Sequence, residues 1–509
     1  MPAPPPDATL LPRPTKSRAR QGTFTFSPTT SLRVTEGAEP AAELLRTLLA
    51  PATGLPLSPA ADGTVVLALD PGLTGLGEEG YGLTVGPRSV LLRAARLTGL
   101  MRGVQTLRQL LPAQALARTA QRGVRWTLPC VEITDVPRHP WRGAMLDVAR
   151  HFQPIAYLRR YVDLLALHKI NVFHLHLTDD QGWRMPVAAY PKLTEIGGRR
   201  AQSLVGPTGD TFDGVPHGGA YTRAELAGLV EYAAARGVTV MPEIEMPGHV
   251  RAALAAYPHL GNDPSRTLDV WTRWGVCDTV LGVHDEVLDF CRTVLEEVMD
   301  VFPSPYVHVG GDECPRTEWE SSPVAQARVA SEGLGGTAGL HRWFLGRIGE
   351  VLVRAGRRPV GWAETGTELP AGFTVMAWRD PAHALAAASR GHDVINAHYR
   401  ATYLDYPQRD DPGEPPGQPG AVVGLRDVHG HDPVPEGADP YATARVLGTQ
   451  AQLWTEFAAT PERLEHLTFP RLCALADRGW SGPTAWDDFR SRLDRHTPRL
   501  DALGVGRRP

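Results

Sequence analysis

The sequence predicts an α/β protein, a (β/α)8 TIM barrel preceded by a small α+β domain. Beyond Pro137, apolar strand-like segments alternate with amphipathic helical segments, which is the sequence form of repeated β-α units around a parallel sheet. Eight such strand segments can be counted, and the long irregular segments each follow a strand and precede a helix. In a barrel these loops would all lie on the C-terminal face, where barrel enzymes build their sites.

The eight strand candidates are short and apolar, and each ends near polar residues. An open doubly wound sheet is the alternative fold, but eight units and the lack of a Gly-rich phosphate-binding motif favour the barrel. The strand candidates are residues 143–149, 171–178, 237–245, 306–312, 358–364, 373–379, 393–399 and 446–454, and the long loops are residues 180–221, 247–283, 314–337 and 400–444.

Helices between these strands carry recognisable start signals. Apolar residues recur at helical spacing over 155–165. Thr222 and Glu225 form a predicted capping box, and Thr460 is a predicted N-cap in front of Pro461. These signals predict helices in the connections of the barrel.

The composition and the predicted elements change along the chain and divide it into three segments. Residues 1–22 are predicted to be a disordered, Pro-rich leader, residues 23–135 a small α+β domain, and residues 136–509 the barrel. The second segment has strand candidates and one helical segment but no clustered acids or bases, so a packing or positioning role is expected for it. Its strand candidates are residues 23–27, 64–70 and 81–86, and its helical candidate is residues 99–111.

The composition limits the kinds of partner, the cellular location and the cofactors that are expected for this protein. With 52 Lys and Arg against 56 Asp and Glu, the net charge is -4, so neither nucleic acid nor an anionic membrane surface is indicated. No apolar run is long enough to span a membrane, and the N-terminus lacks the apolar core of a secretory signal, so a cytoplasmic location is predicted and secretion is left open. Five scattered cysteines without a C-x-x-C pair suggest neither disulfides nor a zinc site, and no cofactor is predicted. The oligomeric state is left open.

If the barrel is correct, the polar residues at the strand ends converge on one pocket. Carboxylates accept hydrogen bonds from sugar hydroxyls, and indole rings cover the apolar face of a pyranose, so this mixture predicts a small carbohydrate as substrate. Any one of these residues alone could be structural, and their joint placement carries the interpretation. The residues are Arg150, Asp179, Glu245, His249, Asp312, Glu313, Trp362, Glu364, Trp378, Asp380, Tyr403, Asp405, Trp454 and Glu456.

The neighbouring acids Asp312 and Glu313 suggest a division of labour. Glycosidic cleavage needs an acid and an anionic group, usually from different strands. Adjacent residues cannot easily flank one bond, because consecutive side chains point in different directions. We therefore expect Glu313 to be the acid, with the Asp312 charge helping to keep it protonated. Asp312 would face a substrate amide, whose carbonyl oxygen could serve as the nucleophile.

Five motifs together resemble glycoside hydrolase family 20, the β-N-acetylhexosaminidases. They are LDVARHF, KINVFHLHLTDDQGWR, PEIEMPGH, HVGGDE and LWTE, in this order along the chain. Several motifs in the right order are specific, whereas GGDE alone is weak. The resemblance implies an exo-acting, retaining enzyme that removes terminal N-acetylhexosamine through an oxazolinium intermediate.

The resemblance also implies roles for individual residues. Glu313 would be the general acid and base, and Asp312 would orient the acetamido group. Glu245 departs from the family pattern, which often has Asp there, and this puts the role of His249 in doubt. The remaining substrate-binding residues implied are Arg150 and Glu456 for the ring hydroxyls, Asp405 for the outer hydroxyls, Tyr403 for the acetamido oxygen, Trp362, Trp378 and Trp454 for the acetamido pocket, and Asp179 and His249 as a polar chain behind the acid.

Two alternatives remain at this stage. His174 and His176 at the end of a barrel strand could bind a metal in a hydrolase, although no further ligand is evident, and His429 and His431 lie in a long loop. A sugar-binding protein without catalysis is the second alternative, and the intact pair of acids argues against it.

Overall fold

The computed structural model describes residues 9–365 and 368–506, and its centre is a closed barrel of eight parallel strands. The strands follow one another around the barrel in chain order, and β18 pairs with β7 to close it. All eight predicted strand segments form barrel strands, so the predicted (β/α)8 fold is confirmed. The strands are β7 (Trp141–Asp147), β8 (Val172–His176), β13 (Thr239–Glu243), β14 (Tyr306–His308), β15 (Arg358–Ala363), β16 (Thr374–Ala377), β17 (Val394–Asn396) and β18 (Val446–Ala451).

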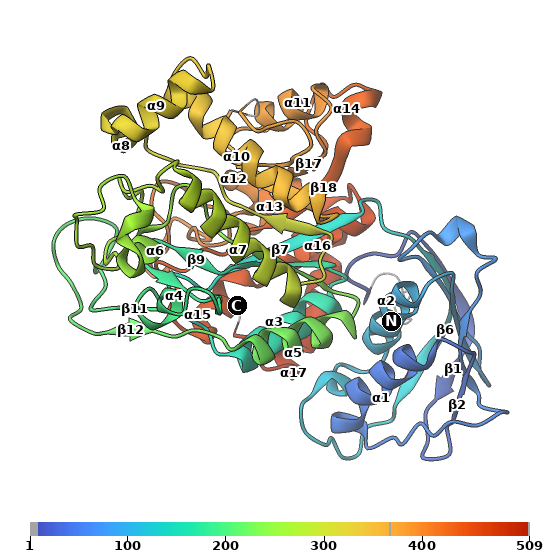
Figure 1. The fold of residues 1–509 in the computed structure, drawn as a ribbon. Helices are drawn as coiled ribbons and strands as arrows, with labels where there is room; N and C mark the ends of the chain where they lie inside the picture. The colour runs from blue at the N-terminus through green and yellow to red at the C-terminus, as the bar shows by residue number, and fades with distance from the viewer. Residues whose placement is uncertain (1–8, 366–367, 507–509) are drawn as a thin grey trace.

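Long helices surround the barrel (Figure 1). The predicted capping box opens α5, because the Thr222 side chain accepts from the Glu225 N–H and Glu225 accepts from the Thr222 N–H. Thr460 caps α15 as predicted, but two further helices follow it. The surrounding helices are α3 (Ile155–Leu167), α5 (Arg223–Ala234), α7 (Asp285–Val301), α10 (Thr337–Arg354), α11 (Pro381–Ser389), α15 (Pro461–Thr468), α16 (Arg471–Ser481) and α17 (Trp486–Ala502).

Short elements interrupt the long loops after the strands. Two-stranded ribbons lie in the loop after β8, and short helices lie in the others, because these segments bury apolar side chains such as Leu193, Leu254 and Trp319. The elements are β9 (Thr178–Asp179), β10 (Gly182–Trp183), α4 (Lys192–Glu195), β11 (Arg199–Arg200), β12 (His217–Gly218), α6 (Arg251–Ala256), η4 (Pro258–Leu260), α8 (Thr317–Ser321), α9 (Pro323–Ser331), α12 (Tyr399–Thr402), α13 (Leu425–Gly430) and α14 (Pro440–Arg445).

A six-stranded sheet with two helices precedes the barrel and lies beside it, in blue in Figure 1. Helix α2 is buried along almost its whole length, because it packs between this sheet and the barrel side of the molecule. The elements are β1 (Lys16–Thr25), β2 (Leu32–Val34), α1 (Glu39–Thr53), β3 (Val65–Leu69), η2 (Thr74–Leu76), β4 (Tyr81–Val85), β5 (Val90–Ala94), α2 (Leu97–Leu110), η3 (Ala113–Leu116) and β6 (Thr127–Asp135).

The expectation of a disordered leader over residues 1–22 is wrong for its second half. Leu10 and Leu11 are buried, and β1 begins at Lys16 and pairs with β6. The Pro-rich composition suggested disorder, but the two leucines supply enough apolar surface to anchor the segment. Residues 1–8 lie outside the described residues. Among the helices of the described part, none is both long and apolar enough to cross a membrane.

A buried network around Asp135 joins the N-terminal sheet to the barrel. The carboxylate of Asp135 pairs with the Lys169 ammonium at 2.7 Å. It also accepts from Trp480 Nε1 at 2.8 Å and from the Tyr81 hydroxyl at 2.7 Å. Because Lys169 follows α3 and Trp480 ends α16, the first and last β-α units of the barrel are held by the same carboxylate.

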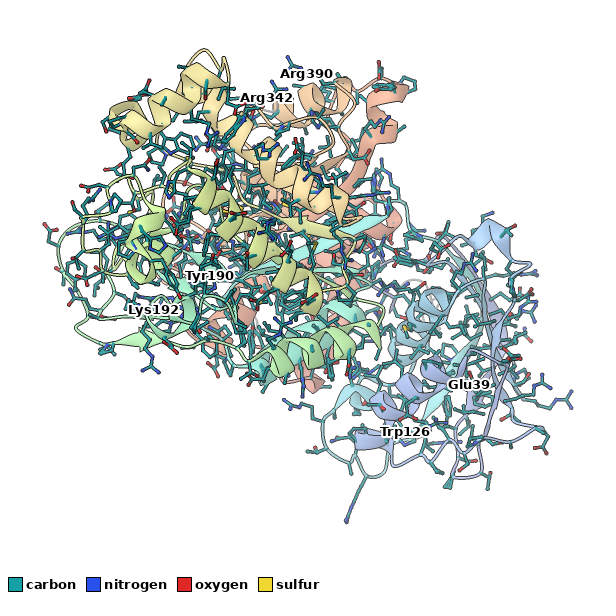
Figure 2. All side chains as sticks on the ribbon, in the orientation of Figure 1. Glu39, Trp126, Tyr190, Lys192, Arg342 and Arg390 are labelled. Atoms are coloured by element: carbon teal, nitrogen blue, oxygen red, sulfur yellow. The ribbon has the colours of Figure 1, made fainter. Side chains whose placement is uncertain are left out.

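We predict that Lys169→Met destabilises the protein by about 3–5 kcal/mol, because the Asp135 charge would stay buried without its cation. Denaturant-induced unfolding monitored by circular dichroism measures this difference. Lys192→Met is the matched control, since Lys192 is exposed (Figure 2) and should change stability little. Equal stability of both variants would contradict this role of the Asp135 network.

Candidate active site

A pocket lies at the C-terminal ends of the barrel strands, and most predicted site residues line it. Trp362, Glu364 and Asp380 are the predicted residues that the pocket lining does not include. Tyr406 and Gln418 also line it, and only their place in the long loop after β17 could have pointed to them. The lining residues are Arg150, Asp179, Glu245, His249, Asp312, Glu313, Trp378, Tyr403, Asp405, Tyr406, Gln418, Trp454 and Glu456.

The turn after β14 places the neighbouring acids in the pocket. Gly310 and Gly311 have φ of 65° and 93°, and Glu313 has φ of 44°, which is uncommon for a residue with a side chain. A Cβ atom at Gly310 would overlap the carboxylate of Glu245, so only glycine fits there. Such strained backbone is concentrated at functional sites, and here it leaves carboxylate oxygens of Asp312 and Glu313 within 4.8 Å of one another.

Asp312 is buried and only 8% exposed, and its Oδ1 has no hydrogen-bond partner among the described residues. Burial raises the pKa of Asp312 to about 7, and the Glu313 carboxylate adds to the effect while His249 opposes it. The sequence predicted an effect of the Asp312 charge on Glu313, but it did not predict this raised pKa of Asp312 itself. Sequence alone could not rank the burial of two adjacent side chains.

Glu313 lies nearer the pocket mouth and contacts three neighbouring residues. Its backbone N–H donates to Glu364 Oε1 at 2.6 Å, and its Oε1 accepts from Arg379 Nη2 at 3.0 Å. Its Oε2 lies 3.8 Å from His249 Nε2. Arg379, which also stacks over Trp378, was missed because the sequence reading of the end of β16 considered only Trp378 and Asp380.

His249 links Glu313 to two carboxylates behind it. Its Nδ1 lies 3.1 Å from Asp180 Oδ2 and 3.3 Å from Asp179 Oδ1. Burial lowers the pKa of His249, but the two carboxylates outweigh it and raise the pKa well above its usual range. The ring therefore carries a positive charge, with Nε2–H facing Glu313. This is the polar chain that the motifs implied, with Asp180 as an additional member.

The far end of the pocket combines Arg150 with acceptors. Arg150 Nη2 lies 2.8 Å from Asp179 Oδ2, and its Nη1 lies 3.9 Å from Glu456 Oε1. Asp405 is buried, neither of its carboxyl oxygens has a partner among the described residues, and burial followed by the Glu456 charge raises its pKa well above its usual range. Gln181 Oε1 accepts from Arg150 Nε at 2.9 Å and holds the guanidinium in place. The Asp405 oxygens have no donor among the described residues, so the hydroxyl groups of a sugar are suitable donors to them.

Aromatic rings form another wall. Trp378 and Tyr403 stack with centroids 6.1 Å apart and planes 18° apart, and Trp454 lies 6.3 Å from Tyr403. Trp362 is buried behind Trp454, at 6.0 Å, and its indole N–H donates to Glu243 Oε1 at 2.7 Å. In this structure Trp362 thus supports the wall and does not line the pocket.

Glu245 is buried against Asp312. Its Oε2 has no partner among the described residues, and burial followed by the Asp312 charge raises its pKa well above its usual range. A protonated Glu245 is neutral, so it adds no second negative charge beside Asp312. The sequence predicted Glu245 in the pocket and marked it as a departure from the family pattern, but its contact with Asp312 could not be predicted.

A cluster beneath the pocket bears on the metal alternative. His174 Nε2 and His308 Nδ1 lie 3.0 Å and 2.8 Å from the Glu243 carboxylate, which also accepts from His176 Nδ1. Glu243 and His308 thus supply the neighbours that the sequence reading could not find, and three of these side chains could hold a metal ion. The cluster is fully buried and outside the pocket lining, and burial opposed by the Glu243 charge leaves the pKa of His176 raised to about 10. His176 therefore forms an ion pair with Glu243, whereas burial lowers the pKa of His174 to about 4, so that charge pairing and close polar contacts around Glu243 account for these residues.

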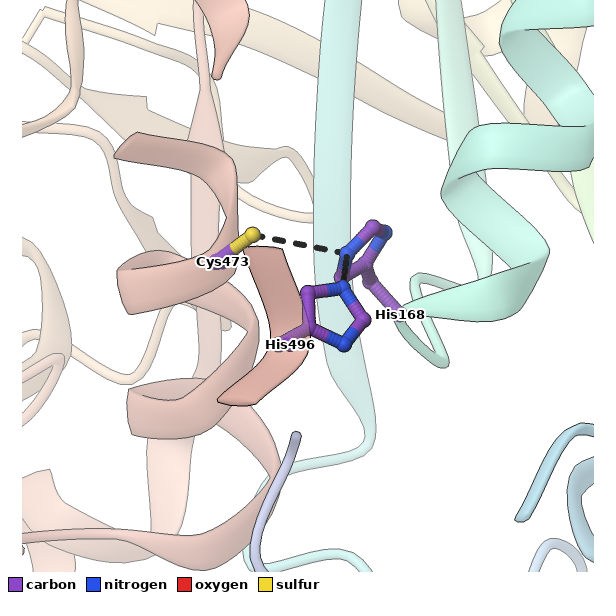
Figure 3. Close-up of side chains that lie close together, drawn as sticks. All are labelled: His168, Cys473 and His496. Atoms are coloured by element: carbon purple, nitrogen blue, oxygen red, sulfur yellow. Dashed lines mark hydrogen bonds between the residues drawn. The ribbon is translucent and has the colours of Figure 1, made fainter. Parts of the chain in front are cut away.

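Another group that could hold a metal lies outside the pocket lining: His168 follows α3, Cys473 lies on α16 and His496 on α17 (Figure 3). His168 Nε2 lies 3.0 Å from His496 Nε2 and 3.4 Å from Cys473 Sγ, and His168 Nδ1 contacts the Leu164 carbonyl at 2.7 Å. Because Nδ1 donates to that carbonyl, Nε2 of neutral His168 is free to accept. Burial lowers the pKa of His168 to about 4, which fits neutral, hydrogen-bonded rings. His429 and His431, the other histidines considered, lie apart in and after α13.

The chain is similar to known proteins over most of its length. The family models described as "Glycosyl hydrolase family 20, catalytic domain" and "Glycosyl hydrolase family 20, domain 2" match residues 139–483 and 7–136. The beta-hexosaminidase of Porphyromonas gingivalis is 37% identical over 97% of this chain, and the chain spans 64% of that protein's length. The beta-hexosaminidase of Akkermansia muciniphila is 37% identical over 85% of this chain and 86% of its own length.

Two solved structures share the whole architecture. The GH20 exo beta-N-acetylglucosaminidase from Vibrio harveyi, in complex with N-acetylglucosamine, has a TM-score of 0.88 and 32% identity, covering 100% of this chain and 80% of its own. The GH20 beta-N-acetylhexosaminidase from Streptomyces coelicolor A3(2) has a TM-score of 0.86 and 33% identity, covering 99% of this chain and 98% of its own.

The raised pKa of Asp312 predicts a pH-dependent effect of Asp312→Asn on stability. The folded pKa of about 7 lies above the ordinary value of 3.8, so wild-type stability declines as pH rises through 7, whereas Asn cannot ionise. We expect the Tm of the variant relative to wild type to rise by about 2 °C between pH 5 and pH 8. Scanning calorimetry at both pH values measures it, with the exposed Asp410→Asn as control. A constant difference would mean that Asp312 is ionised in the folded protein at both pH values.

Proposed function

The chain belongs to glycosyl hydrolase family 20, as the motifs predicted, and we propose that it is an exo-acting, retaining β-N-acetylhexosaminidase. It removes terminal N-acetylglucosamine or N-acetylgalactosamine from a carbohydrate by substrate-assisted catalysis. The observation that supports this best is the pair Asp312 and Glu313, held in one pocket with different burial and different partners.

The terminal sugar binds with its hydroxyls toward Arg150, Asp405 and Glu456 and its acetamido group toward Asp312. Partnerless oxygens of Asp405 and Asp312 accept from the sugar hydroxyls and the amide N–H, respectively. Tyr403, Trp378 and Trp454 enclose the acetamido group, and Trp362 supports Trp454 from behind. Because every one of these contacts is made to a single sugar ring, the pocket favours removal of one residue at a chain end.

In the first chemical step, protonated Glu313 gives its proton to the glycosidic oxygen as the bond from that oxygen to C1 breaks. The acetamido carbonyl oxygen forms the new bond to C1, and the positive charge of the resulting oxazolinium ring develops beside the Asp312 carboxylate. No covalent bond to the protein forms in this step.

In the second step, Glu313 takes a proton from water while the water oxygen attacks C1 from the side the leaving group left. The bond from C1 to the acetamido oxygen breaks, and the product keeps the β configuration. Asp179, Asp180 and the His249 ring support Glu313 from behind, since His249 Nε2 faces its carboxylate.

The pocket fits a small sugar, and we do not expect the protein to bind nucleic acid. The cytoplasmic location stays a prediction. A binding protein without catalysis is the second candidate, and the retained Arg379, Glu364 and His249 contacts of Glu313 speak against it. A metal-dependent hydrolase is the other alternative, because His249, Asp312 and Glu313 in the pocket lining lie close enough together to hold a metal ion. The neighbouring carboxylates raise the pKa of His249 well above its usual range, and a protonated ring cannot bind a metal.

We predict that wild type hydrolyses an aryl N-acetyl-β-glucosaminide, and that Glu313→Gln loses about 10²–10⁴-fold in kcat/KM on chitobiose. The same variant should keep far more of its rate on an aryl glycoside with a very acidic phenol, because such a leaving group needs little protonation. Steady-state kinetics on both substrates measure this split.

Glu368→Gln is the control, because Glu368 lies in the loop beside Glu364 and outside the pocket lining, and it should affect the two substrates alike. Equal loss on both substrates in Glu313→Gln would argue against the acid role, and no hydrolysis by wild type would favour a binding protein.

A further inference from the structure

A groove lined by four arginines lies beside the active-site pocket. Arg199, Arg200, Arg251 and Arg273 all contribute to its lining, together with Trp271 and the acidic residue Asp269. The groove is formed by β11, the start of α6 and the end of the loop after α6, which lie on one side of the barrel (Figure 1). In a chain whose net charge is -4, four guanidinium groups around one groove are a local excess of positive charge.

Three of these arginines lack an anionic partner within the protein. In the described part of the chain, no carboxylate lies within the 4.0 Å ion-pair distance of Arg199, Arg200 or Arg251, and Arg273 pairs with the exposed Asp210. In the described structure the Arg251 side chain donates to the backbone carbonyl of Asp269, at 2.8 Å, and to no carboxylate. The groove therefore presents guanidinium groups that no side chain neutralises.

Arg200 is the most informative of the four. It is only 3% exposed, and its Nη2 has no hydrogen-bond partner among the described residues. Its other nitrogens donate to Ser203 Oγ at 2.8 Å and to the Gln181 carbonyl at 3.4 Å, both neutral groups. Burial lowers the pKa of Arg200 to about 9. Asp147 and Asp213 act on this cation only from beyond ion-pair distance, so a bound anion that reached it would offset part of the cost of burying it.

We propose that this arginine groove binds an oxyanion, such as a sulfate, phosphate or carboxylate group, either free or carried by a glycan. Arginine suits these groups because its planar fork donates two parallel hydrogen bonds to two oxygens of one anion. Lys192, on α4 beside the groove, is not among its lining residues, so arginine alone provides its positive charge.

The groove is connected to the catalytic pocket by two hydrogen-bonded residues. Gln181 accepts from Arg150 Nε at 2.9 Å and donates to the Arg273 carbonyl at 2.8 Å. Asp180 accepts from the Arg251 N–H at 2.9 Å and lies 3.1 Å from His249 Nδ1. An anion in the groove would bind on segments that also hold the sugar-binding arginine and the histidine behind Glu313.

Thermal unfolding with sodium sulfate at constant ionic strength tests the site. Sulfate should raise the Tm of wild type saturably, because it binds only the folded state. The double variant Arg199→Gln/Arg251→Gln should need at least tenfold more sulfate for the same shift, while Arg390→Gln, at an exposed arginine that follows α11 and lies outside the groove lining (Figure 2), should behave as wild type.

A second arm distinguishes the source of the anion. Oligosaccharides that end in N-acetylglucosamine, with and without a uronic acid, are compared by calorimetric titration of wild type and double variant. At least threefold tighter binding of the acidic glycan, lost in the double variant, supports a glycan-borne anion, and a sulfate effect without this preference supports a free ion.

No saturable shift with sulfate and no preference for the acidic glycan would overturn the proposal, as would equal shifts in all variants. Hydrolysis of an aryl N-acetyl-β-glucosaminide by the double variant reports separately on the catalytic pocket. Failure of the anion site therefore stays distinguishable from failure of the proposed activity.

Discussion

The structure depends on the burial of carboxyl groups that the protein itself does not pair. Asp312, Glu245 and Asp405 each bury at least one oxygen without a partner among the described residues, and all three line one pocket. Such groups cost free energy in the empty protein. The cost is recovered only when a ligand brings donors to the same positions. The amide N–H and hydroxyls of an N-acetylated sugar are donors of this kind, and the oxazolinium charge adds a stronger interaction with Asp312 in the transition state.

The rest of the fold keeps these groups in place. The glycine turn after β14 and the left-handed backbone of Glu313 separate two adjacent side chains into a buried and an outer position. His249 also has a left-handed backbone and is held by Asp179 and Asp180. Away from the pocket, Asp135 ties the N-terminal sheet to the first and last units of the barrel. The Asp135 network thus supports the barrel that carries these strained residues.

Much of this arrangement could be predicted from sequence because barrel topology brings strand ends together whatever their separation in the chain. That rule placed Arg150, Asp312 and Glu456 in one pocket. It could not find Glu243 and His308, which point beneath the pocket, or the stacking of Arg379 over Trp378, since these depend on side-chain direction. The raised pKa of Asp312 could not be predicted because it depends on how deeply this side chain is buried compared with Glu313. The ordered structure of residues 10–22 could not be predicted because it depends on two buried leucines in a Pro-rich segment.

The central claim is that the substrate's own acetamido oxygen is the nucleophile and that Asp312 steers it. Aryl N-acetyl-β-glucosaminides whose acetyl group carries one, two or three fluorine atoms test this directly, because fluorine withdraws electron density from that oxygen and barely alters its position. Our account predicts that kcat/KM falls steeply with each added fluorine. Rates that stay level across the series would contradict it and point to a nucleophile on the protein.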